Sequence, residues 1–235
     1  MNPHTSQEYI SIVWHELRTP LTSIRWYTSM ILEWDMWEIS DDARKALNHC
    51  YDSSVRLIKL VNDVLALSKI ESWRMEYYKK NVDITEILKS IYNDMFLEME
   101  TKWLDFEINI DKRLKQEKIN IDKDRLKQVF INLLSNAIKF TKSGWKIILK
   151  ATKKDSKVLF EIIDNWIGIE KEKIELLFDK FTQIESSMQR HNTSWLWLWL
   201  ALCKNFIKDF WSQIKVKSEI WKWSTFYFEI DLINN

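Results

Sequence analysis

The sequence predicts an α+β protein in two parts. We expect a long helical hairpin that pairs with a second copy as a four-helix bundle, followed by an α/β sandwich of helices on a mixed sheet. Apolar residues keep a three-four spacing over about residues 1–72, and helix-like and strand-like segments mix afterwards. The length of 235 residues suits one large domain or two small ones, at roughly 100–200 residues per domain.

The hairpin is predicted from two apolar series separated by a polar break at Glu33–Ser40, where Ser40 or Asp41 caps the second helix. The first series is Ile10, Val13, Leu17, Leu21, Ile24 and Ile31, and the second is Ala43, Leu47, Cys50, Leu57, Val61 and Val64. A seam this narrow buries little by itself, so we expect a homodimer.

The second part is predicted to contain three helices and six strands. The helices are 84–101, 122–141 and 198–210, and the strands are 104–110, 119–121, 146–151, 158–164, 213–220 and 224–230. Residues 180–194 lack periodicity and are expected to form a long loop, which is usually functional. The expected domains are 1–72 and 79–235, joined by a linker at 73–78.

Composition excludes several functions. The 35 basic and 34 acidic residues leave a net charge of +1, so we expect no binding to nucleic acid. No apolar run approaches the roughly 18 residues that a membrane-spanning helix needs, and Met1–Tyr9 is too polar for a signal peptide. Cys50 and Cys203 are expected to be buried thiols in a reducing compartment. We therefore expect a cytoplasmic chain, either separate or as the cytosolic part of a membrane receptor.

Residues 13–22 read VWHELRTPLT. With Leu17 and Ile24 in the hairpin seam, His15 points away from it. An exposed histidine is usually only solvated, but Glu16 can accept the imidazole proton and Thr19 lies one turn along the same face. Pro20 interrupts the helix hydrogen bonds at a cost of about 3 kcal/mol and predicts a bend.

The segment HELRTPLT resembles the H-box of two-component sensor histidine kinases, and the resemblance extends over nearly the whole chain. It implies that His15 accepts the γ-phosphoryl group of ATP and that Glu16 is the base for this step. Thr19 matches the position that orients water for dephosphorylation of the partner. The implied partners are a second copy of the chain and the receiver domain of a response regulator, whose aspartate receives the phosphoryl group.

The helix 122–141 contains NLLSNAIKF, in which Asn132, Asn136 and Lys139 share one face. On the residues alone, solvent exposure is the commoner explanation for two helical asparagines. However, the segment resembles the N-box of the GHKL ATPases, which have the Bergerat fold. That resemblance makes Asn136 the Mg²⁺ ligand, places Asn132 and Lys139 on the phosphates of ATP, and puts Phe140 beside the adenine.

Three further segments resemble boxes of the same ATPases. In DNWIGI (164–169), Asp164 would accept a hydrogen bond from the adenine amino group, with Gly168 in the loop that follows; a strand-end Asp that opens a turn is the alternative. In LFDKFTQIESS (177–187), Phe181 anchors a lid. The cofactor-binding residues implied downstream are Gln183, Arg190, Trp195, Trp197 and Trp199, the three tryptophans standing where the family has phosphate-binding glycines.

The chain has 14 tryptophans and only 2 glycines. Tryptophan stands at family glycine positions throughout, including Trp166, Trp221 and Trp223, where an indole is sterically wrong. We hypothesise that UGA codons meaning glycine were translated as tryptophan; UGG codons in the gene would refute this. If the tryptophans are literal, the alternative is a catalytically dead dimeric scaffold. A GHKL ATPase of the chaperone or DNA-repair kind gives no reason for the H-box.

Overall fold

The computed structural model describes residues 3–33, 39–72, 75–165, 168–174, 177 and 196–233. Within these ranges, the side chains of 3–16, 71, 172–173 and 196–198 lie outside the description. The chain divides into unit 1, Met1–Met75, and unit 2, Glu76–Asn235. None of the helices in the described ranges is long and apolar enough to cross a membrane.

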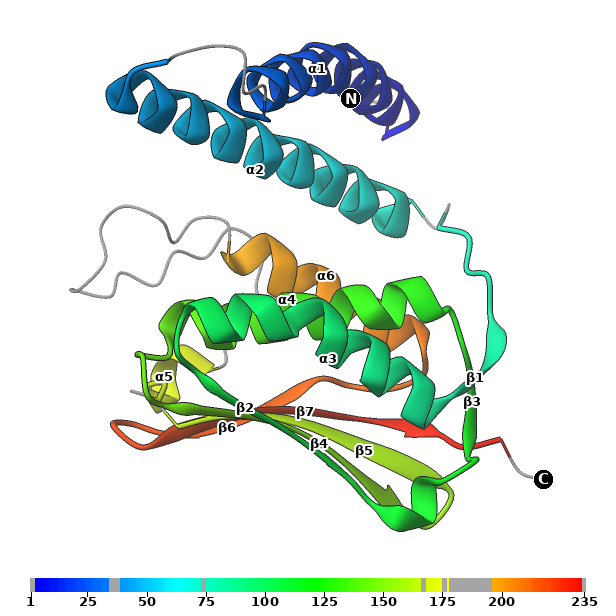
Figure 1. Cartoon of the computed structure of the whole chain (residues 1–235). Coiled ribbons are helices and arrows are strands. Elements are labelled where there is room, and N and C mark those ends of the chain that lie inside the picture. Colours follow the sequence, from blue (N-terminus) through cyan, green and yellow to red (C-terminus); the bar gives the residue numbers. More distant parts are fainter. Residues whose placement is uncertain are drawn as a thin grey trace. The chain divides into compact units, whose positions relative to one another are not determined.

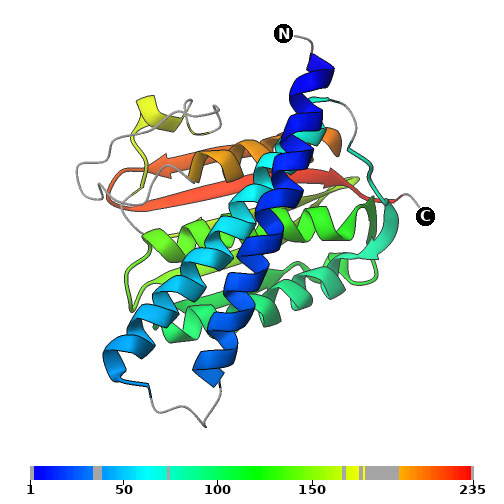
Figure 2. The same ribbon diagram turned by 90° about the horizontal axis from the view of Figure 1, so that it is seen from above.

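Unit 1 is the predicted hairpin (Figure 1). Helix α1 spans Pro3–Glu33 and runs through Pro20, and α2 spans Asp41–Glu71. The Ser40 side chain accepts a hydrogen bond from the Ala43 backbone N–H at 3.2 Å, so the predicted cap is confirmed. Figure 2 shows the two helices crossing side by side.

Within one copy of the hairpin, residues of the predicted seam differ in how far they are buried. Leu21 and Thr28 are buried, and the Thr28 hydroxyl donates to the Ile24 carbonyl at 2.7 Å, which lets a polar side chain lie there. Leu17 and Ile24, by contrast, remain 43% and 47% exposed. The prediction of a buried thiol at Cys50 is wrong, since this residue is exposed on α2.

Unit 2 contains a five-stranded sheet in the order β2-β4-β5-β7-β6. Its strands are β2 (Asp105–Ile110), β4 (Lys146–Lys154), β5 (Lys157–Asp164), β6 (Lys215–Glu219) and β7 (Trp223–Asp231). The sheet is mixed, as predicted, because β2 is parallel to β4 and the other neighbours are antiparallel. β3 (Lys118–Ile121) pairs separately with β1 (Lys80–Asp83).

The sequence did not predict β1, the 3-10 helix η1 (Lys112–Leu114) or α5 (Lys171–Ile174). Each of these elements has three or four residues, too few to display a period of hydrophobicity. All the longer elements of unit 2 lie within a few residues of their predicted positions.

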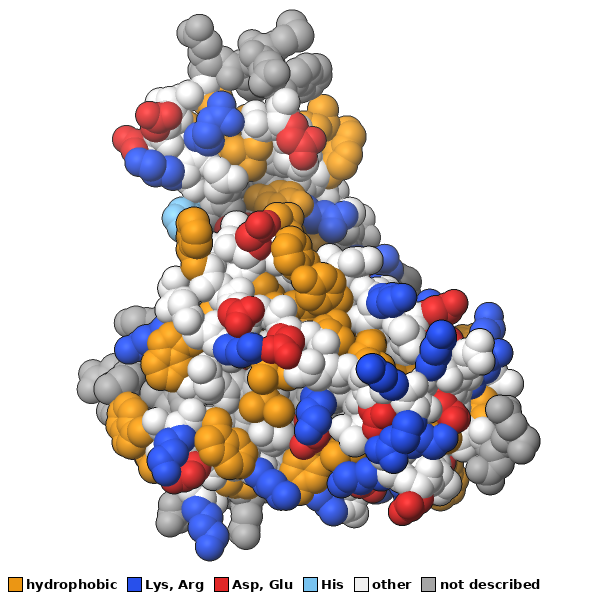
Figure 3. All heavy atoms as spheres, turned by 60° about the horizontal axis from the view of Figure 1, so that its bottom comes forward, with side chains coloured by type: hydrophobic (Ala, Val, Ile, Leu, Met, Phe, Trp, Pro, Cys, Tyr) orange, Lys and Arg blue, Asp and Glu red, His pale blue; other side chains and the backbone are white. Residues whose placement is uncertain are grey.

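Helices α3 (Ile84–Thr101), α4 (Lys123–Phe140) and α6 (Leu196–Asp209) cover one face of the sheet (Figure 1). The core between them includes three aromatic rings: Phe130 of α4 lies 5.2 Å from Phe160 and 5.5 Å from Phe228, between ring centroids. The face turned away from the helices carries charged side chains of both signs (Figure 3), including the ion pair Lys150–Glu161. The sandwich therefore has one covered face, on which a ligand can be enclosed.

Candidate functional site

Helix α4 presents two asparagines to the interior of unit 2. Asp122 starts the helix by accepting from the backbone N–H groups of Asp124 and Arg125. Asn132 and Asn136 are only 1% and 6% exposed, so solvent exposure, the commoner alternative for helical asparagines, is wrong here. Buried amides need polar partners, which makes this face of α4 the candidate site.

The two asparagines differ in their partners. The Asn132 side-chain N–H₂ points at Cys203 Sγ of α6, at 3.9 Å, and this thiol in turn lies 3.9 Å from the Val129 carbonyl oxygen. The Nδ2 atom of Asn136 has no hydrogen-bond partner among the described residues. Leaving such a group unsatisfied costs about 1–3 kcal/mol, so the Asn136 amide fits a site that a polar ligand completes.

Lys139 adds a positive charge one turn after Asn136. Burial, followed by the nearby Lys102 ammonium, lowers the pKa of the Lys139 side chain, and an anion bound beside it would counter both effects. The Lys139 ammonium lies 5.4 Å from the ring centroid of Phe140, and Lys102 donates to the Ile138 carbonyl at 3.3 Å. Sequence reasoning missed Lys102, which has no motif around it.

Asp164 is the last residue of β5 and is 9% exposed. Val158, Phe160, Ile162 and Asp164 are spaced two residues apart, so their side chains lie on the same face of the strand. Phe160 packs against Phe130 of α4, so this is the face that the helices cover. The structure therefore brings Asp164 and the α4 residues to the same face of the sheet.

The loop after Asp164 is held by contacts that the sequence did not predict. Gly168 has φ +67°, and a Cβ atom there would lie 2.2 Å from the Glu219 carbonyl oxygen, so only glycine fits. The Ile169 N–H donates to Ser218 Oγ at 2.7 Å, and this hydroxyl donates to the Trp223 carbonyl at 2.9 Å. The turn between β6 and β7 thus supports the Gly168 loop.

Several predicted site residues lie outside what the structure describes. Phe181, Gln183, Arg190 and Trp195 lie outside the described residues, as do the side chains of His15, Glu16 and Trp197. His15 and Glu16 belong to α1, Trp197 and half-buried Trp199 to α6, and exposed Thr19 accepts the Ser23 hydroxyl on its carbonyl at 3.1 Å.

The residues present fit Mg²⁺ bound together with phosphate rather than a protein-only metal site. Among the residues that the structure describes, no three His, Cys, Asp or Glu side chains form a group that could hold a metal ion. Mg²⁺ commonly takes one or two protein oxygens and completes its shell with phosphates and water. The side-chain Oδ1 atom of Asn136 is an oxygen of this kind.

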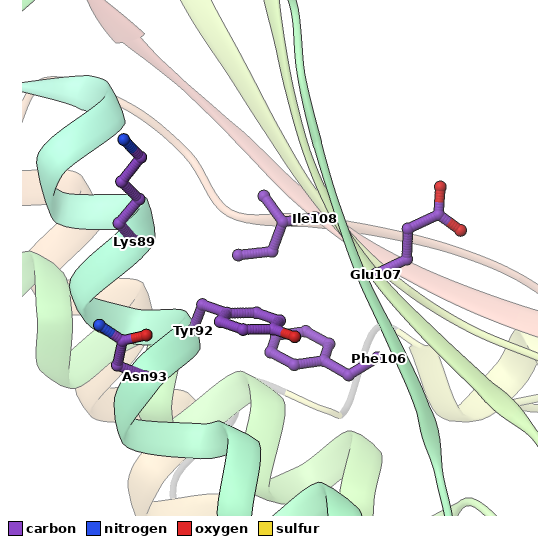
Figure 4. A pocket seen from close by; sticks show the side chains of 6 residues that line it. All are labelled: Lys89, Tyr92, Asn93, Phe106, Glu107 and Ile108. Carbon is purple, nitrogen blue, oxygen red and sulfur yellow. The ribbon is translucent and has the colours of Figure 1, made fainter.

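A separate hollow of about 470 Å³ lies between α3 and the edge strand β2. The Tyr92 ring stacks on Phe106 at 5.2 Å between centroids, and Glu107 points away from the hollow (Figure 4). None of the site residues predicted from the sequence lines it.

Among the residues that the structure describes, three tryptophans have left-handed backbone conformations. Trp103, Trp211 and Trp221 have φ of +55°, +61° and +64°. Trp103 and Trp211 follow the ends of α3 and α6, where the next N–H reaches back to the helix, Leu104 to Met99 O and Ser212 to Ile207 O. Glycine is the usual residue at this helix-ending position.

Two family models match the chain. Residues 5–73 match the His Kinase A phospho-acceptor domain, and residues 121–234 match the histidine kinase-, DNA gyrase B- and HSP90-like ATPase. The first match includes the segment around His15, and the second includes α4, Asp164 and α6.

Curated relatives match over nearly the whole of this chain. Drug sensory protein A of Synechocystis is 34% identical over 95% of this chain and 34% of its own length. The circadian input-output histidine kinase CikA of Synechococcus elongatus is 29% identical over 93% of this chain and 29% of its own length. The aerobic respiration control sensor ArcB of Escherichia coli is 30% identical over 94% of this chain and 28% of its own length. The chain thus spans about a third of these relatives.

Solved structures share the fold. Full-length ShkA in complex with AMPPNP has a TM-score of 0.79 at 23% identity, with 97% of this chain and 46% of that one covered. Histidine kinase ThkA in complex with the response regulator TrrA has a TM-score of 0.64 at 22% identity, covering 95% of this chain and 61% of that one.

Proposed function

We propose that this chain is a two-component sensor histidine kinase, which phosphorylates itself on His15 with ATP and passes the phosphoryl group to an aspartate of a response regulator. Models of a phospho-acceptor domain and of an ATPase domain match it in one polypeptide, and relatives named as a histidine kinase and a sensor protein match nearly all of it. The observation that carries the proposal is the buried Asn136 on α4, whose amide lacks a partner for Nδ2 among the described residues. It lies inside the matched ATPase domain, as a nucleotide site requires.

In this proposal each residue of the ATP site has one task. Asp164 accepts a hydrogen bond from the adenine amino group, Phe140 flanks the ring, and Asn132 and Lys139 contact the phosphates. Asn136 offers its carbonyl oxygen to Mg²⁺, which when bound neutralises phosphate charge. Gly168 lets the backbone approach the nucleotide. The further contacts proposed from the sequence are Phe181, Gln183, Arg190, Trp195, Trp197 and Trp199.

The phosphoryl transfer requires residues of both domains. A ring nitrogen of His15 attacks the γ-phosphorus, the bond to the β–γ bridging oxygen breaks, and ADP leaves with the electron pair. Glu16 takes the imidazole proton, and Thr19 orients water when the regulator is dephosphorylated. Positioning and charge neutralisation supply most of the rate in such transfers.

The proposed assembly is a homodimer through the hairpin. Leu17, Ile24 and Val64 are 43%, 47% and 39% exposed within one copy, and a second hairpin would bury them as a four-helix bundle. A receiver domain is the proposed second partner, as in the ThkA complex. The proposed domains are 1–72 and 79–235 with a connection at 73–78, and the proposed location is the cytoplasm, where ATP is available.

We further propose that the tryptophans stand for glycines, through UGA codons read as tryptophan. The positive φ of Trp103, Trp211 and Trp221 supports this, since bulky residues adopt this conformation at a cost of roughly 1–2 kcal/mol. The literal alternative, a dead scaffold, is not favoured, because the relatives are named as histidine kinases or sensors.

The test uses the glycine-restored chain, in which the 14 tryptophans are replaced by glycine. This chain is incubated with Mg²⁺ and γ-phosphate-labelled ATP. We expect a label that is stable to alkali and labile to acid, as a phosphohistidine is. His15→Ala should abolish it. His49→Ala, which changes another histidine of the same hairpin, should not. Label that persists in His15→Ala contradicts the site.

A further inference from the structure

The connection between the two units is fixed to unit 2 before the first strand begins. Residues 75–79 have no regular structure, yet the Tyr77 ring packs edge-on against Phe206 and Phe210, at 6.5 Å and 5.6 Å between centroids. The Tyr77 hydroxyl donates a hydrogen bond to the Asp209 carboxylate. These three partners lie on the last turns of α6 or directly after it.

The next residue, Tyr78, binds the same segment to the N-terminal cap of α4. The Tyr78 backbone N–H donates to Asp122 Oδ2 at 2.9 Å, while Asp122 Oδ1 caps α4. The Arg125 guanidinium lies 5.5 Å from the Phe206 ring centroid, joining the two sets of contacts. We call this cluster the Tyr77 clamp; its members are Tyr77, Tyr78 N–H, Asp122, Arg125, Phe206, Asp209 and Phe210.

The hydrogen bond from the Tyr77 hydroxyl to the Asp209 carboxylate is retained at neutral pH. Burial, followed by the hydrogen bond to Asp209, raises the pKa of the Tyr77 hydroxyl. The hydroxyl therefore stays protonated and remains a donor to the carboxylate, and a hydrogen bond to a charged acceptor is among the stronger kinds.

We infer that Tyr77 is a positioning residue for phosphoryl transfer: the Tyr77 clamp fixes the connection onto α4 and α6 and thereby limits how far the nucleotide site can range from His15. This inference rests on the proposed function. The clamp lies at the start of α4 and the end of α6, whereas Asn136 and Lys139 lie in the last two turns of α4. Tyr77 is thus not a residue that touches ATP.

The length of the connection gives the expected size of the effect. Tyr77 lies six residues after Glu71, the end of α2, which gives a reach of at most about 20 Å. When the Tyr77 ring is lost and the Tyr78 N–H bond to Asp122 opens with it, the first fixed residue becomes Lys80 at the start of β1. Lys80 lies nine residues after Glu71, so the reach grows to about 30 Å. A longer tether lowers the effective concentration of one domain at the other, here by about two- to fourfold.

The experiment compares Tyr77→Ala with Tyr78→Ala in the full-length glycine-restored chain. Tyr78 is the matched control, because its ring is 72% exposed and the substitution keeps its backbone N–H. We expect Tyr77→Ala to lower kcat for autophosphorylation by about two- to fourfold while KM for ATP stays the same. Tyr78→Ala should change neither. Tyr77→Phe and Asp209→Asn, which weaken only the hydrogen bond, should give smaller losses of kcat.

An insertion of Gly-Ser-Gly after Ser72 tests the tether without disturbing the core of unit 2. It should lower kcat as Tyr77→Ala does, and it decides the question if Tyr77→Ala fails to fold. Unchanged kcat in either variant overturns the inference, as does a KM for ATP that rises in proportion to the loss of kcat.

Failure of the proposed function would look different. If the parent chain takes no label, the proposed function fails; hydrogen exchange of the amides at Phe206–Phe210 then tests the clamp. That exchange should be faster in Tyr77→Ala and unchanged in Tyr78→Ala, and equal exchange in both contradicts the clamp. If the parent takes label on His15 and both Tyr variants keep its kcat, only this inference fails.

Discussion

Two pairs of residues, one pair in each unit of this chain, depart from ordinary burial in opposite ways. The hairpin leaves Leu17 and Ile24 more than 40% exposed, whereas unit 2 buries Asn132 and Asn136 to 6% exposure or less. Exposed aliphatic side chains gain about 25 cal/mol per Å² when another apolar surface covers them, and buried amides gain from a polar ligand. This difference is the basis of the two proposals, that a second hairpin covers the first and that a polar small molecule completes the sandwich.

Replacing Asn136 should have the largest effect of the changes considered. It should weaken ATP binding without lowering the stability of the fold. Asn136→Leu keeps the volume but removes the amide, so ATP binding should weaken at least 100-fold, or about 3 kcal/mol. The free energy of unfolding should stay equal or rise by about 1 kcal/mol, because an unsatisfied buried group is removed. Asn93→Leu, at an exposed position of α3, is the control. Titration calorimetry and urea unfolding measure the two quantities, and a stable Asn136→Leu protein that binds ATP normally breaks the comparison.

A charged residue at an exposed apolar position of the hairpin tests whether a second hairpin covers that position. Ile24→Asp would place a carboxylate in the bundle seam, and we expect the dimer dissociation constant to rise about 10- to 100-fold. Thr22→Asp adds the same charge at an exposed polar position and should leave it nearly unchanged. Sedimentation equilibrium measures both; equal dimerisation of the two variants would show that Ile24 lies outside the interface.

Tryptophan-to-glycine changes should have opposite signs in the two units. Trp221→Gly relieves a φ of +64° in a turn of unit 2 and should stabilise the fold by about 1 kcal/mol. Trp26→Gly lies inside helix α1 with the indole 58% exposed, and should destabilise the hairpin by about 1 kcal/mol, since glycine is a poor helix former. Thermal unfolding reads both, and destabilisation by Trp221→Gly would argue for a literal tryptophan there.

The smallest expected effect concerns acid stability. Hydrogen bonds from the Arg113 side chain and backbone lower the pKa of the Asp111 carboxyl. A carboxyl with a lowered folded-state pKa stabilises the fold above its unfolded pKa of about 3.9, and this contribution is lost as the pH falls below that value. Asp111→Asn should therefore flatten the loss of stability of unit 2 below about pH 4. Asp42→Asn in the hairpin, where the pair with Lys45 is exposed, should change little; the same slope in all three proteins would contradict this.

The sequence predicted the long elements well because their patterns are periodic and capped, as at Ser40 and Asp122. It did not show that Asn132 faces α6 or that Asn136 is buried, since helical spacing tells which residues share a face but not what covers that face. Likewise, Leu17 and Leu21 share a stripe in sequence, yet only Leu21 is buried within one copy. The Tyr77 clamp could not be predicted, because it joins residues more than 100 positions apart without any motif.

The central claim is that the two units perform two halves of one reaction, with ATP held on unit 2 and the phosphoryl group accepted on His15. Mass spectrometry of the glycine-restored chain after incubation with Mg²⁺ and ATP, digested under alkaline conditions, tests it most directly. The account predicts a single phosphate on the peptide that contains His15, absent in Asn136→Leu. Phosphate on another residue, or on His15 in spite of Asn136→Leu, would contradict it.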